Sequence, residues 1–371
     1  MWQMIMALLF LAEIAGFAYL ASRIYRFGFV KRISNGNKKT GIAVCLAILL
    51  LLFSGAWLFM GYMNAVICIL HVVAFYLIFD GIFWLAGKMK KKKIKPYYAG
   101  IAAVFFSVCY LTAGWYLAHD VQQTSYTVET EKAAGSLRIL LFSDSHIGTT
   151  FDGEGFLTYV NEMQENHPDV VVITGDFVDD DTSKEDMVAA CSALGTLKTT
   201  YGVYYAFGNH DKGYYGAAYR GYDGDDLIAE LEKNQVIVLQ DESRLIDDRF
   251  YIIGRQDLSE EAGPGGERAA MDKLTGQLDM DKFIIVLDHQ PCDYENQIKA
   301  GVDLVLSGHT HGGQLFPLGF ISRLVSENEK IYGYEKRENT NFIVTSGISD
   351  WAIRFKTGCK SEYVVIDIKG N

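Results

Sequence analysis

The motif Gly308–Gln314, of sequence GHTHGGQ, directly follows the apolar run Val302–Leu306. Its two imidazoles, His309 and His311, therefore stand where a buried strand opens into a glycine-rich loop, a place suited to a metal site. A His-x-His pair alone is weak evidence, because the same spacing occurs by chance on exposed strands and loops. Its weight depends on polar clusters that lie earlier in the chain.

Four such clusters each follow an apolar run that predicts a strand. They are Ser143-Asp144-Ser145-His146, Gly175-Asp176, Gly208-Asn209-His210-Asp211 and Asp288-His289-Gln290-Pro291. In α/β sheets, ligands bind beyond the carboxyl ends of the strands. We therefore expect all five clusters to meet at one edge of the sheet structure.

The side chains of these clusters would form a mixed oxygen and nitrogen ligand set. Its members are Asp144, His146, Asp176, Asn209, His289, His309 and His311. The set is too large for one ion and suits two borderline divalent ions such as manganese, iron or zinc. The lack of thiolates argues against a structural zinc site. Each cluster alone has an ordinary explanation, since Gly-Asp is often a turn and Asn-His-Asp can cap a helix.

Short apolar runs alternate with amphipathic stretches from residue 137 onward. We predict strands at Leu137–Phe142, Val170–Thr174, Gly202–Phe207, Gln235–Leu239, Phe250–Ile253, Lys282–Leu287, Val302–Leu306, Phe342–Thr345 and Tyr363–Ile368. We predict helices at about Phe156–Asn166, Lys184–Leu197, Leu227–Asn234 and Arg268–Gln277. This alternation indicates an α/β domain with buried, partly parallel sheets.

The first 118 residues differ in composition from the rest of the chain. Their net charge is +10, so the whole-chain value of −11 leaves −21 for residues 119–371. They hold apolar runs at about Met1–Ala21, Gly41–Met60, Asn64–Gly87 and Tyr97–Ala118. Each is close to the ~20 residues that cross a bilayer as a helix, whereas a buried core helix rarely lacks a polar face. We predict a four-span transmembrane region over 1–118, a linker over 119–136 and one domain over 137–371.

Basic loops orient the predicted spans. The loops Arg23–Thr40 and Lys88–Lys95 each hold six Lys and Arg residues, whereas the link around Gly61–Met63 holds none. Short loops rich in Lys and Arg stay in the cytoplasm. The C-terminal domain is therefore predicted on the extracytoplasmic side of a cell membrane, and the assignment would invert if one helix were only interfacial.

The ordered set Asp-x-His, Gly-Asp, Gly-Asn-His-Asp, a lone His after a strand and Gly-His-Thr-His resembles the calcineurin-like metallophosphoesterase superfamily over about residues 137–369. The GHTHGGQ string and the stretch Ser346–Arg354 resemble its membrane-anchored bacterial branch, close to YkuE-like and lipid-pyrophosphatase-like enzymes. The resemblance implies a four-layer α/β/β/α sandwich of two mixed sheets flanked by helices, preceded here by the four-helix transmembrane region.

The resemblance also implies roles for individual residues. One metal ion would be held by Asp144, His146 and His311. The other would be held by Asn209, His289 and His309, with Asp176 bridging both. His210 would face the substrate, and Asp211 would orient its ring. Two such ions can bind a shared water, lower its pKa to about 7 and hold it for in-line attack on phosphorus.

The implied activity is metal-dependent hydrolysis of a phosphate ester or diphosphate bond. A phosphorylated small molecule or a lipid-linked or cell-envelope compound is the expected substrate. We expect membrane lipids as partners, and neither nucleic acid nor an obligate protein partner. A non-catalytic metal-binding sensor or scaffold at the membrane is the alternative, although mere binding would not need His210 and Asp211. A transporter with a regulatory domain is a third reading.

Candidates for substrate contacts lie in loops around the site. The glycine-rich loop Lys212–Asp226 contains Tyr214, and its tyrosines either face a ligand or pack on the domain. Arg220 and Arg354 are candidates for bidentate phosphate binding, with ordinary surface or ion-pair arginines as the alternative. The apolar run Leu315–Phe320 and Trp351 are expected to admit a lipid tail or to rest on the bilayer.

Overall fold

The chain divides into two compact units, Met1–Gly114 and Trp115–Asn371, in a computed structural model that describes residues 2–89, 97–262 and 266–371. Most of the basic loop Lys88–Lys95 lies outside the described residues. The unit boundary falls within the last helix of the predicted transmembrane region, four residues before its expected end at 118.

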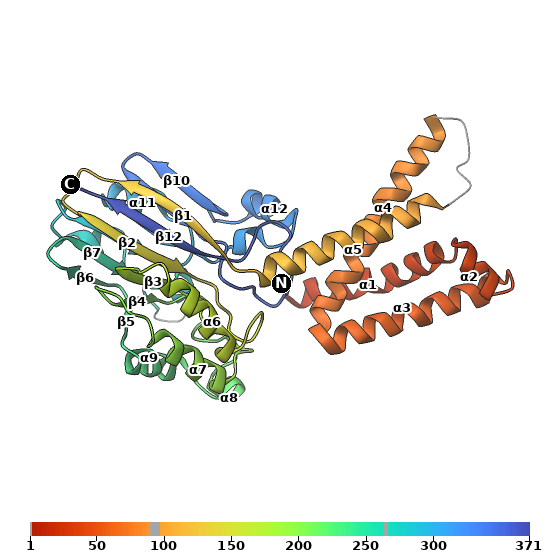
Figure 1. Cartoon of the computed structure of the whole chain (residues 1–371), viewed down its shortest axis with the longest axis horizontal. Coiled ribbons are helices and arrows are strands. Elements are labelled where there is room, and N and C mark those ends of the chain that lie inside the picture. The colour runs from red at the N-terminus through yellow and green to blue at the C-terminus, as the bar shows by residue number, and fades with distance from the viewer. Residues whose placement is uncertain (1, 90–96, 263–265) are drawn as a thin grey trace. The chain divides into compact units, whose positions relative to one another are not determined.

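Four helices of the first part of the chain are long and apolar enough to cross a membrane (Figure 1). They are α1 (Trp2–Ile24), α3 (Lys38–Met60), α4 (Tyr62–Met89) and α5 (Tyr98–His119), and the short α2 (Gly28–Ile33) follows α1. The side chain of Asn37 begins α3 by accepting hydrogen bonds from the amides of Lys39 and Thr40. Large apolar side chains are exposed along these helices, which is what contact with lipid requires.

The C-terminal unit contains two six-stranded sheets, counted over the described residues. The first has the order β1-β12-β2-β3-β4-β5, and the second has the order β10-β11-β9-β8-β7-β6. The strands are β1 (Gln122–Glu129), β2 (Ser136–Phe142), β3 (Val170–Thr174), β4 (Val203–Ala206), β5 (Val236–Leu239), β6 (Glu242–Ile246), β7 (Phe250–Gly254), β8 (Phe283–Leu287), β9 (Leu304–Ser307), β10 (Gly333–Arg337), β11 (Thr340–Val344) and β12 (Glu362–Lys369). Both sheets mix parallel and antiparallel pairs.

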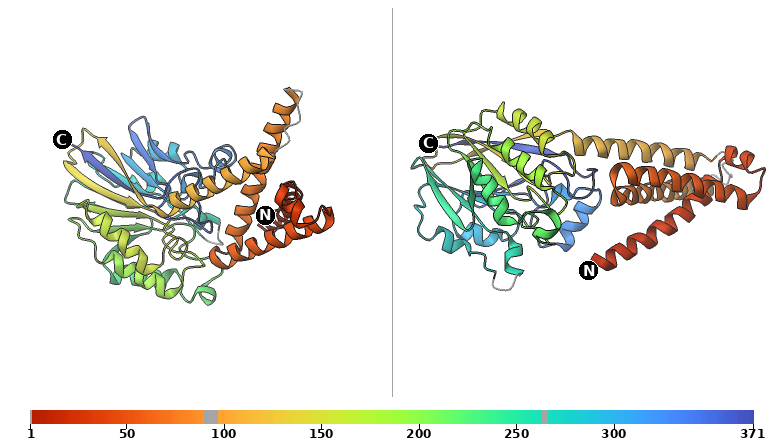
Figure 2. Two further views of the ribbon diagram at one scale, coloured as in Figure 1. Left: turned by 45° about the vertical axis from the view of Figure 1, so that its right-hand side comes forward. Right: turned by 90° about the horizontal axis from the view of Figure 1, so that it is seen from below.

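Helices cover the outer faces of the two sheets. They are α6 (Gly153–Gln164), α7 (Lys184–Leu194) and α9 (Gly224–Lys233) on the first sheet, and α10 (Met271–Thr275) and α11 (Tyr294–Lys299) on the second. The short helices α8 (Ala217–Arg220) and α12 (Leu318–Val325) and the 3-10 turns η1 (Leu258–Ala262) and η2 (His311–Gly313) lie in the connecting segments. Figure 2 shows α6, α7 and α9, in yellow-green to green, gathered on one side of the unit.

Three apolar clusters hold these layers together. One packs the outer face of β2, β3 and β4 against α6, α7 and α9, and another fills the space between the sheets with side chains such as Leu141, Val172, Ile252 and Ile285. A third packs the outer face of the second sheet against α10 and α11. The expected four-layer α/β/β/α sandwich of two mixed sheets is therefore confirmed.

Three strands were not expected from the sequence. The segment 119–136, which we expected to be a linker, instead contains β1, which pairs with β12 along its whole length. Strands β6 and β10 were also missed. All three stand at sheet edges, and most of their residues are exposed or half-buried rather than forming a buried apolar run.

Strand direction places the site at one end of this unit. The parallel strands β2, β3 and β4 end together, and β12 runs antiparallel to β2. The carboxyl ends of β2, β3 and β4 therefore lie at one end of this sheet, and the C terminus of the chain lies at the other end. In Figure 1, α12 occupies that end and the C terminus the other.

Candidate metal centre

Most of the predicted ligands have a backbone conformation that is rare for residues other than glycine. Five of them have φ in the left-handed region: Asp144 (54°), His146 (37°), Asp176 (51°), His309 (70°) and His311 (47°). Such conformations cost of the order of 1–3 kcal/mol each and persist where surrounding contacts impose them. Their concentration here indicates that the loops are shaped by a local task rather than by folding alone.

Two glycines allow these loops to approach closely. A Cβ atom on Gly308 would lie 2.3 Å from Oδ2 of Asp144, and one on Gly208 would lie 2.3 Å from Oδ1 of Asp176. No side chain fits at such separations, since real Cβ atoms stay beyond 3.0 Å. The glycines in the Gly-His-Thr-His and Gly-Asn-His-Asp motifs are thus required by the packing of carboxylates against backbone.

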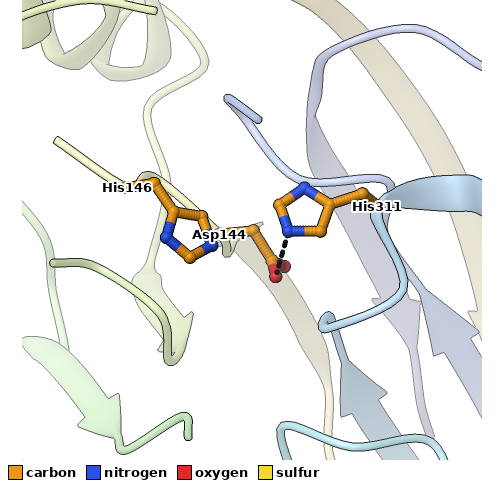
Figure 3. A group of neighbouring side chains, drawn as sticks. All are labelled: Asp144, His146 and His311. Carbon is orange, nitrogen blue, oxygen red and sulfur yellow. Dashed lines mark ion pairs between the residues drawn. The ribbon is translucent and has the colours of Figure 1, made fainter. Parts of the chain in front are cut away.

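The first group of side chains combines the clusters after β2 and β9. Asp144, His146 and His311 each offer one ligand atom, and these atoms lie within 4.8 Å of one another (Figure 3). The Nε2 atom of His311 lies 3.4 Å from Oδ1 of Asp144. The same carboxylate accepts hydrogen bonds of 3.0 Å from the amide of His309, so the two clusters are directly linked.

The second group combines Asp176, His289 and His309, whose ligand atoms also lie within 4.8 Å of one another. Asp176 stands between the two groups. Its Oδ2 lies 3.1 Å from Nε2 of His289 and 3.7 Å from Nε2 of His146. Asp176 is thus placed to contact ions in both groups.

Buried ring nitrogens without protein partners point to a ligand. Nδ1 of His146 donates to Asp179 over 3.0 Å, and Nδ1 of His289 donates to the carbonyl oxygen of Thr174 over 2.6 Å. Among the described residues, Nε2 of His146 and Nε2 of His289 have no hydrogen-bond partner. A buried polar atom without a partner is costly unless something absent from the protein chain binds it. The donor set and its unused atoms therefore fit divalent metal ions.

Asn209 fits the same pattern. Its Nδ2 donates to the hydroxyl oxygen of Tyr214 over 2.8 Å, which turns the amide so that its oxygen faces the other way. That Oδ1 atom is buried and has no partner among the described residues. Tyr214 therefore holds Asn209 in an orientation that leaves its oxygen available to a metal ion.

Burial and neighbouring charges give the candidate ligands different protonation states in the metal-free protein. Burial lowers the pKa of His311 to about 3 and also lowers the pKa of His309, so both rings are neutral near pH 7 and keep a free lone pair. Burial alone would raise the pKa of Asp176. Neighbouring His289 outweighs this and holds the pKa of that carboxyl well below its usual range. Burial alone would lower the pKa of His289, but Asp176 raises it, so in the metal-free protein Nε2 of His289 carries a proton that a bound metal ion would replace.

Asp211 does not have the role that the sequence predicted. Instead of contacting the ring of His210, its buried carboxylate accepts hydrogen bonds from the backbone amides of Asp176, Phe177, Val178 and Gly208. It thereby ties the loop after β3 to the loop after β4. Asp211 is a positioning residue, and the expectation that it orients the imidazole is corrected.

His210 stands at the rim of the centre. Its backbone amide donates to Oδ1 of Asp176 over 2.8 Å, and its ring lies 5.2 Å from that of His146. The rings of Tyr214 and Trp351 each lie 5.1 Å from the His210 ring. Burial lowers the pKa of His210, so the ring is neutral near pH 7 and keeps one N–H to donate.

The candidate substrate arginines differ in placement. Arg220 is buried, and its guanidinium donates to the backbone carbonyls of Asp179, Asp211 and Tyr222. It stabilises the loop Lys212–Asp226 from inside the domain. Because its guanidinium is buried and hydrogen-bonded there, the expected role of Arg220 in phosphate binding is corrected. Arg354 is half-buried in the segment after β11. Of the loop tyrosines, Tyr222 belongs to the core, whereas Tyr214 reaches the centre.

Two buried charged residues near the centre were not predicted from the sequence. Asp179 accepts from His146, and Lys356 holds the segment after β11, whose residues Ile348 and Ser349 donate to the carbonyls of Ser143 and Asp144. Charged residues in loops are usually exposed, so composition gave no signal for either. The only available signal was that Asp179 lies three residues after Asp176.

Comparison with known proteins adds to this geometry. A family model described as calcineurin-like phosphoesterase matches residues 137–313. An uncharacterized metallophosphoesterase of Aquifex aeolicus is 31% identical over 251 residues, covering 66% of this chain and 90% of that protein. The uncharacterized metallophosphoesterase YkuE of Bacillus subtilis is 27% identical over 263 residues, covering 68% and 86%.

The name of a longer relative describes it as a transmembrane protein. A transmembrane protein with metallophosphoesterase domain from Danio rerio is 33% identical over 247 residues, covering 64% of this chain and 54% of that protein. The chain spans less than two thirds of the length of this relative and of several other relatives that it matches. These matches agree with the resemblance that the motifs predict.

Proposed function

The chain belongs to the calcineurin-like phosphoesterase family, and we propose on this premise that its C-terminal unit hydrolyses a phosphate ester or diphosphate bond at a two-metal centre. The observation that carries the proposal is Asp176, which stands between two groups of ligand atoms whose unpaired ring nitrogens face it. Manganese, iron and zinc each suit this mixed nitrogen and oxygen set.

The proposed ligands divide as the geometry groups them. One ion would be held by Asp144, His146 and His311. The other would be held by Asn209, His289 and His309, with Asp176 shared. When bound, the two ions would lower the pKa of a water molecule to about 7 and neutralise phosphate oxygens.

The chain's own residues position and complete this chemistry. Asp179 and the Thr174 carbonyl fix the ring orientations of His146 and His289. His210, at the rim, donates its N–H to an oxygen of the phosphoryl group or of the leaving group. That interaction strengthens as charge develops in the transition state, which is the condition for lowering the barrier. The rings of Tyr214 and Trp351 narrow the approach to His210.

The predicted membrane spans and their basic loops bear on which side of the membrane the activity would occur. We infer that the four apolar helices cross a cell membrane with both basic loops inside, so that the catalytic unit lies on the extracytoplasmic side. Its substrate would then be a phosphorylated small molecule or a lipid-linked compound of that compartment. Reporter fusions at the C terminus test the side: alkaline phosphatase should be active there, and a fluorescent protein that matures only in the cytoplasm should be dark.

The function itself is tested with intact protein purified in detergent. Wild type, Asp176→Ala and the control Asp181→Ala, an exposed carboxylate nearby, are compared for bound metal and for hydrolysis of monoester, diester and diphosphate substrates. We expect wild type and the control to bind two ions per chain and to hydrolyse at least one class, and Asp176→Ala to lose both properties. A wild type that binds two ions but hydrolyses no class would favour the sensor instead.

A further inference from the structure

Helix α12 exposes an apolar surface next to the candidate metal centre. Phe320 is 69% exposed and Leu324 is 72% exposed, and Phe316, Leu318 and Ile321 are also exposed. We call these five residues the α12 surface. Soluble monomeric proteins rarely expose contiguous apolar patches of this kind unless another molecule covers them. Something apolar is therefore expected to meet α12.

The position of α12 is fixed to the metal loop. The backbones of Gly313 and Gly319 touch so closely that a Cβ atom on Gly313 would lie 2.3 Å from Cα of Gly319. Gly313 belongs to the GHTHGGQ motif, two residues after His311. Whatever covers the α12 surface is consequently held beside the metal centre.

The α12 surface is also tied to the end of the last predicted span. Thr357 donates from its amide to the carbonyl of Gln314 over 2.8 Å and accepts from the amide of Phe316 over 3.0 Å. Two residues before Thr357, the Phe355 ring packs on that of Trp115 with centroids 5.6 Å apart.

The same segment continues to the end of α5. Ser361 donates from its amide to the carbonyl of Leu117 and from its hydroxyl to the carbonyl of Ala118, each over 2.9 Å. The last turn of α5, from Trp115 to His119, belongs to the same compact unit as α12. Hydrogen bonds and ring packing thus connect the α12 surface to the place at which the chain would leave the bilayer.

Tryptophan at the end of a span is typical of the membrane interface. Trp115 has this place on α5, while Arg323 exposes a cationic side chain on α12. Amphipathic helices that bind membranes lie in the interface plane, with their apolar side chains below the headgroups and their basic charges among the phosphates. The exposed apolar face and the single basic residue of α12 suit that placement. These features specify lipid, rather than a protein groove, as the occupant.

We propose that the α12 surface inserts into the lipid leaflet beside the last span and presents the metal centre to phosphate esters carried by membrane amphiphiles. The contacts of Trp351 support this proposal. Its ring packs on that of His210, and its carbonyl accepts a hydrogen bond from the side chain of Gln314, just before α12. The substrate part of the proposal rests on the proposed phosphoesterase function, whereas the insertion of α12 does not.

Insertion is tested on the full chain in vesicles of phosphatidylethanolamine and phosphatidylglycerol. An environment-sensitive fluorescent amino acid replaces Phe320 in one variant and Leu245 in a control. Leu245 is an exposed leucine on the edge strand β6 of the same unit. Doxyl-labelled phosphatidylcholine should quench the probe at 320 and leave the probe at 245 bright. Equal quenching at both positions, or protection at 320 accompanied by crosslinking between two copies, would overturn the proposal.

Substrate presentation is tested by charge substitution. Leu324→Glu should lower hydrolysis of a fluorescent phospholipid in vesicles by about tenfold or more, because a charge replaces an apolar side chain that the proposed insertion would bury in lipid. Hydrolysis of a soluble nitrophenyl phosphodiester should stay within about twofold, since the α12 surface would not contact it. Leu245→Glu is the matched control and should leave both rates unchanged.

The outcomes separate the two proposals. Equal loss on both substrates in Leu324→Glu, at an unfolding midpoint unchanged from wild type, would overturn presentation by α12. If wild type hydrolyses neither substrate, the phosphoesterase function fails, and the quenching experiment still decides whether α12 lies in the bilayer.

Discussion

Nδ1 of His146 donates a hydrogen bond over 3.0 Å to Oδ2 of Asp179, a buried carboxylate. This bond leaves Nε2 of His146 directed toward Asp176. His289 is oriented in the same way, but its acceptor is the Thr174 carbonyl. Of the two acceptors, only Asp179 can be removed by a substitution, and it is not itself a proposed ligand.

Asp179→Asn should therefore weaken metal binding while leaving the ligand set complete. A carboxylate behind a ligating histidine fixes its tautomer and raises its basicity, and its loss typically costs about 10- to 100-fold in metal affinity. Titration of the metal-free protein with Mn²⁺ or Zn²⁺ measures the change. Asp181→Asn, the same substitution at an exposed position two residues away, should bind as wild type does. Indistinguishable affinities in both variants would show that the hydrogen bond does not tune the site.

Tyr214→Phe should weaken one metal position only. The hydroxyl that accepts from Nδ2 of Asn209 is lost, while the ring can still pack on His210. Losing one such bond costs of the order of 1 kcal/mol, or about fivefold in affinity. Tyr215→Phe is the control, because Tyr215 is exposed and its ring packs against that of Tyr219. If the affinity of Tyr214→Phe fell equally for both ions, the role of Tyr214 would not be confined to the position that Asn209 occupies.

Local sequence patterns predicted the features that depend on strand ends. Apolar runs marked the buried strands, and the residues directly after them supplied the candidate ligands, because chain direction alone brings the ends of β2, β3 and β4 together. The same reasoning failed for β1, β6 and β10, since an edge strand needs only one covered face.

The direction in which a side chain points could not be predicted from such patterns. Asp211 follows His210 in sequence, yet its carboxylate turns to four backbone amides of neighbouring loops. Arg220 lies in a loop rich in glycine and tyrosine, which suggests exposure, but that loop folds so that the guanidinium caps buried carbonyls. Both outcomes depend on contacts between segments far apart in the chain.

His210→Asn should separate catalysis from metal binding. Its ring contributes no ligand atom to either group, so two ions should remain bound. The loss of its N–H at the reacting phosphoryl group should lower kcat by about 10²–10⁴-fold. Metal analysis together with kcat and KM on a soluble diester gives the result. An unchanged kcat would remove His210 from the proposed chemistry, and loss of both ions would make its role structural.

Lys356→Met should destabilise the wall of the site that carries Trp351. The buried ammonium donates to the carbonyls of Ser346, Gly347 and Ser349 and lies 3.4 Å from Oδ1 of Asp350. Its removal leaves a buried carboxylate without its cation, a change that typically costs about 3–5 kcal/mol. The midpoint of thermal unfolding in detergent measures the loss. Adding Asp350→Asn to Lys356→Met should restore part of it, because no unpaired charge then remains.

The same pair predicts a pH dependence. Burial raises the pKa of Asp350 from 3.8 to about 6. Between about pH 4 and pH 6 the folded protein keeps a proton that the unfolded chain has released, so this carboxyl makes folding less favourable as the pH rises through that window. Asp350→Asn removes the titrating group. Its unfolding midpoint relative to wild type should therefore increase from about pH 4 to about pH 7. Midpoints that stay parallel over this range would show that Asp350 is already ionised in the folded protein at low pH and that its charge is fully compensated by Lys356.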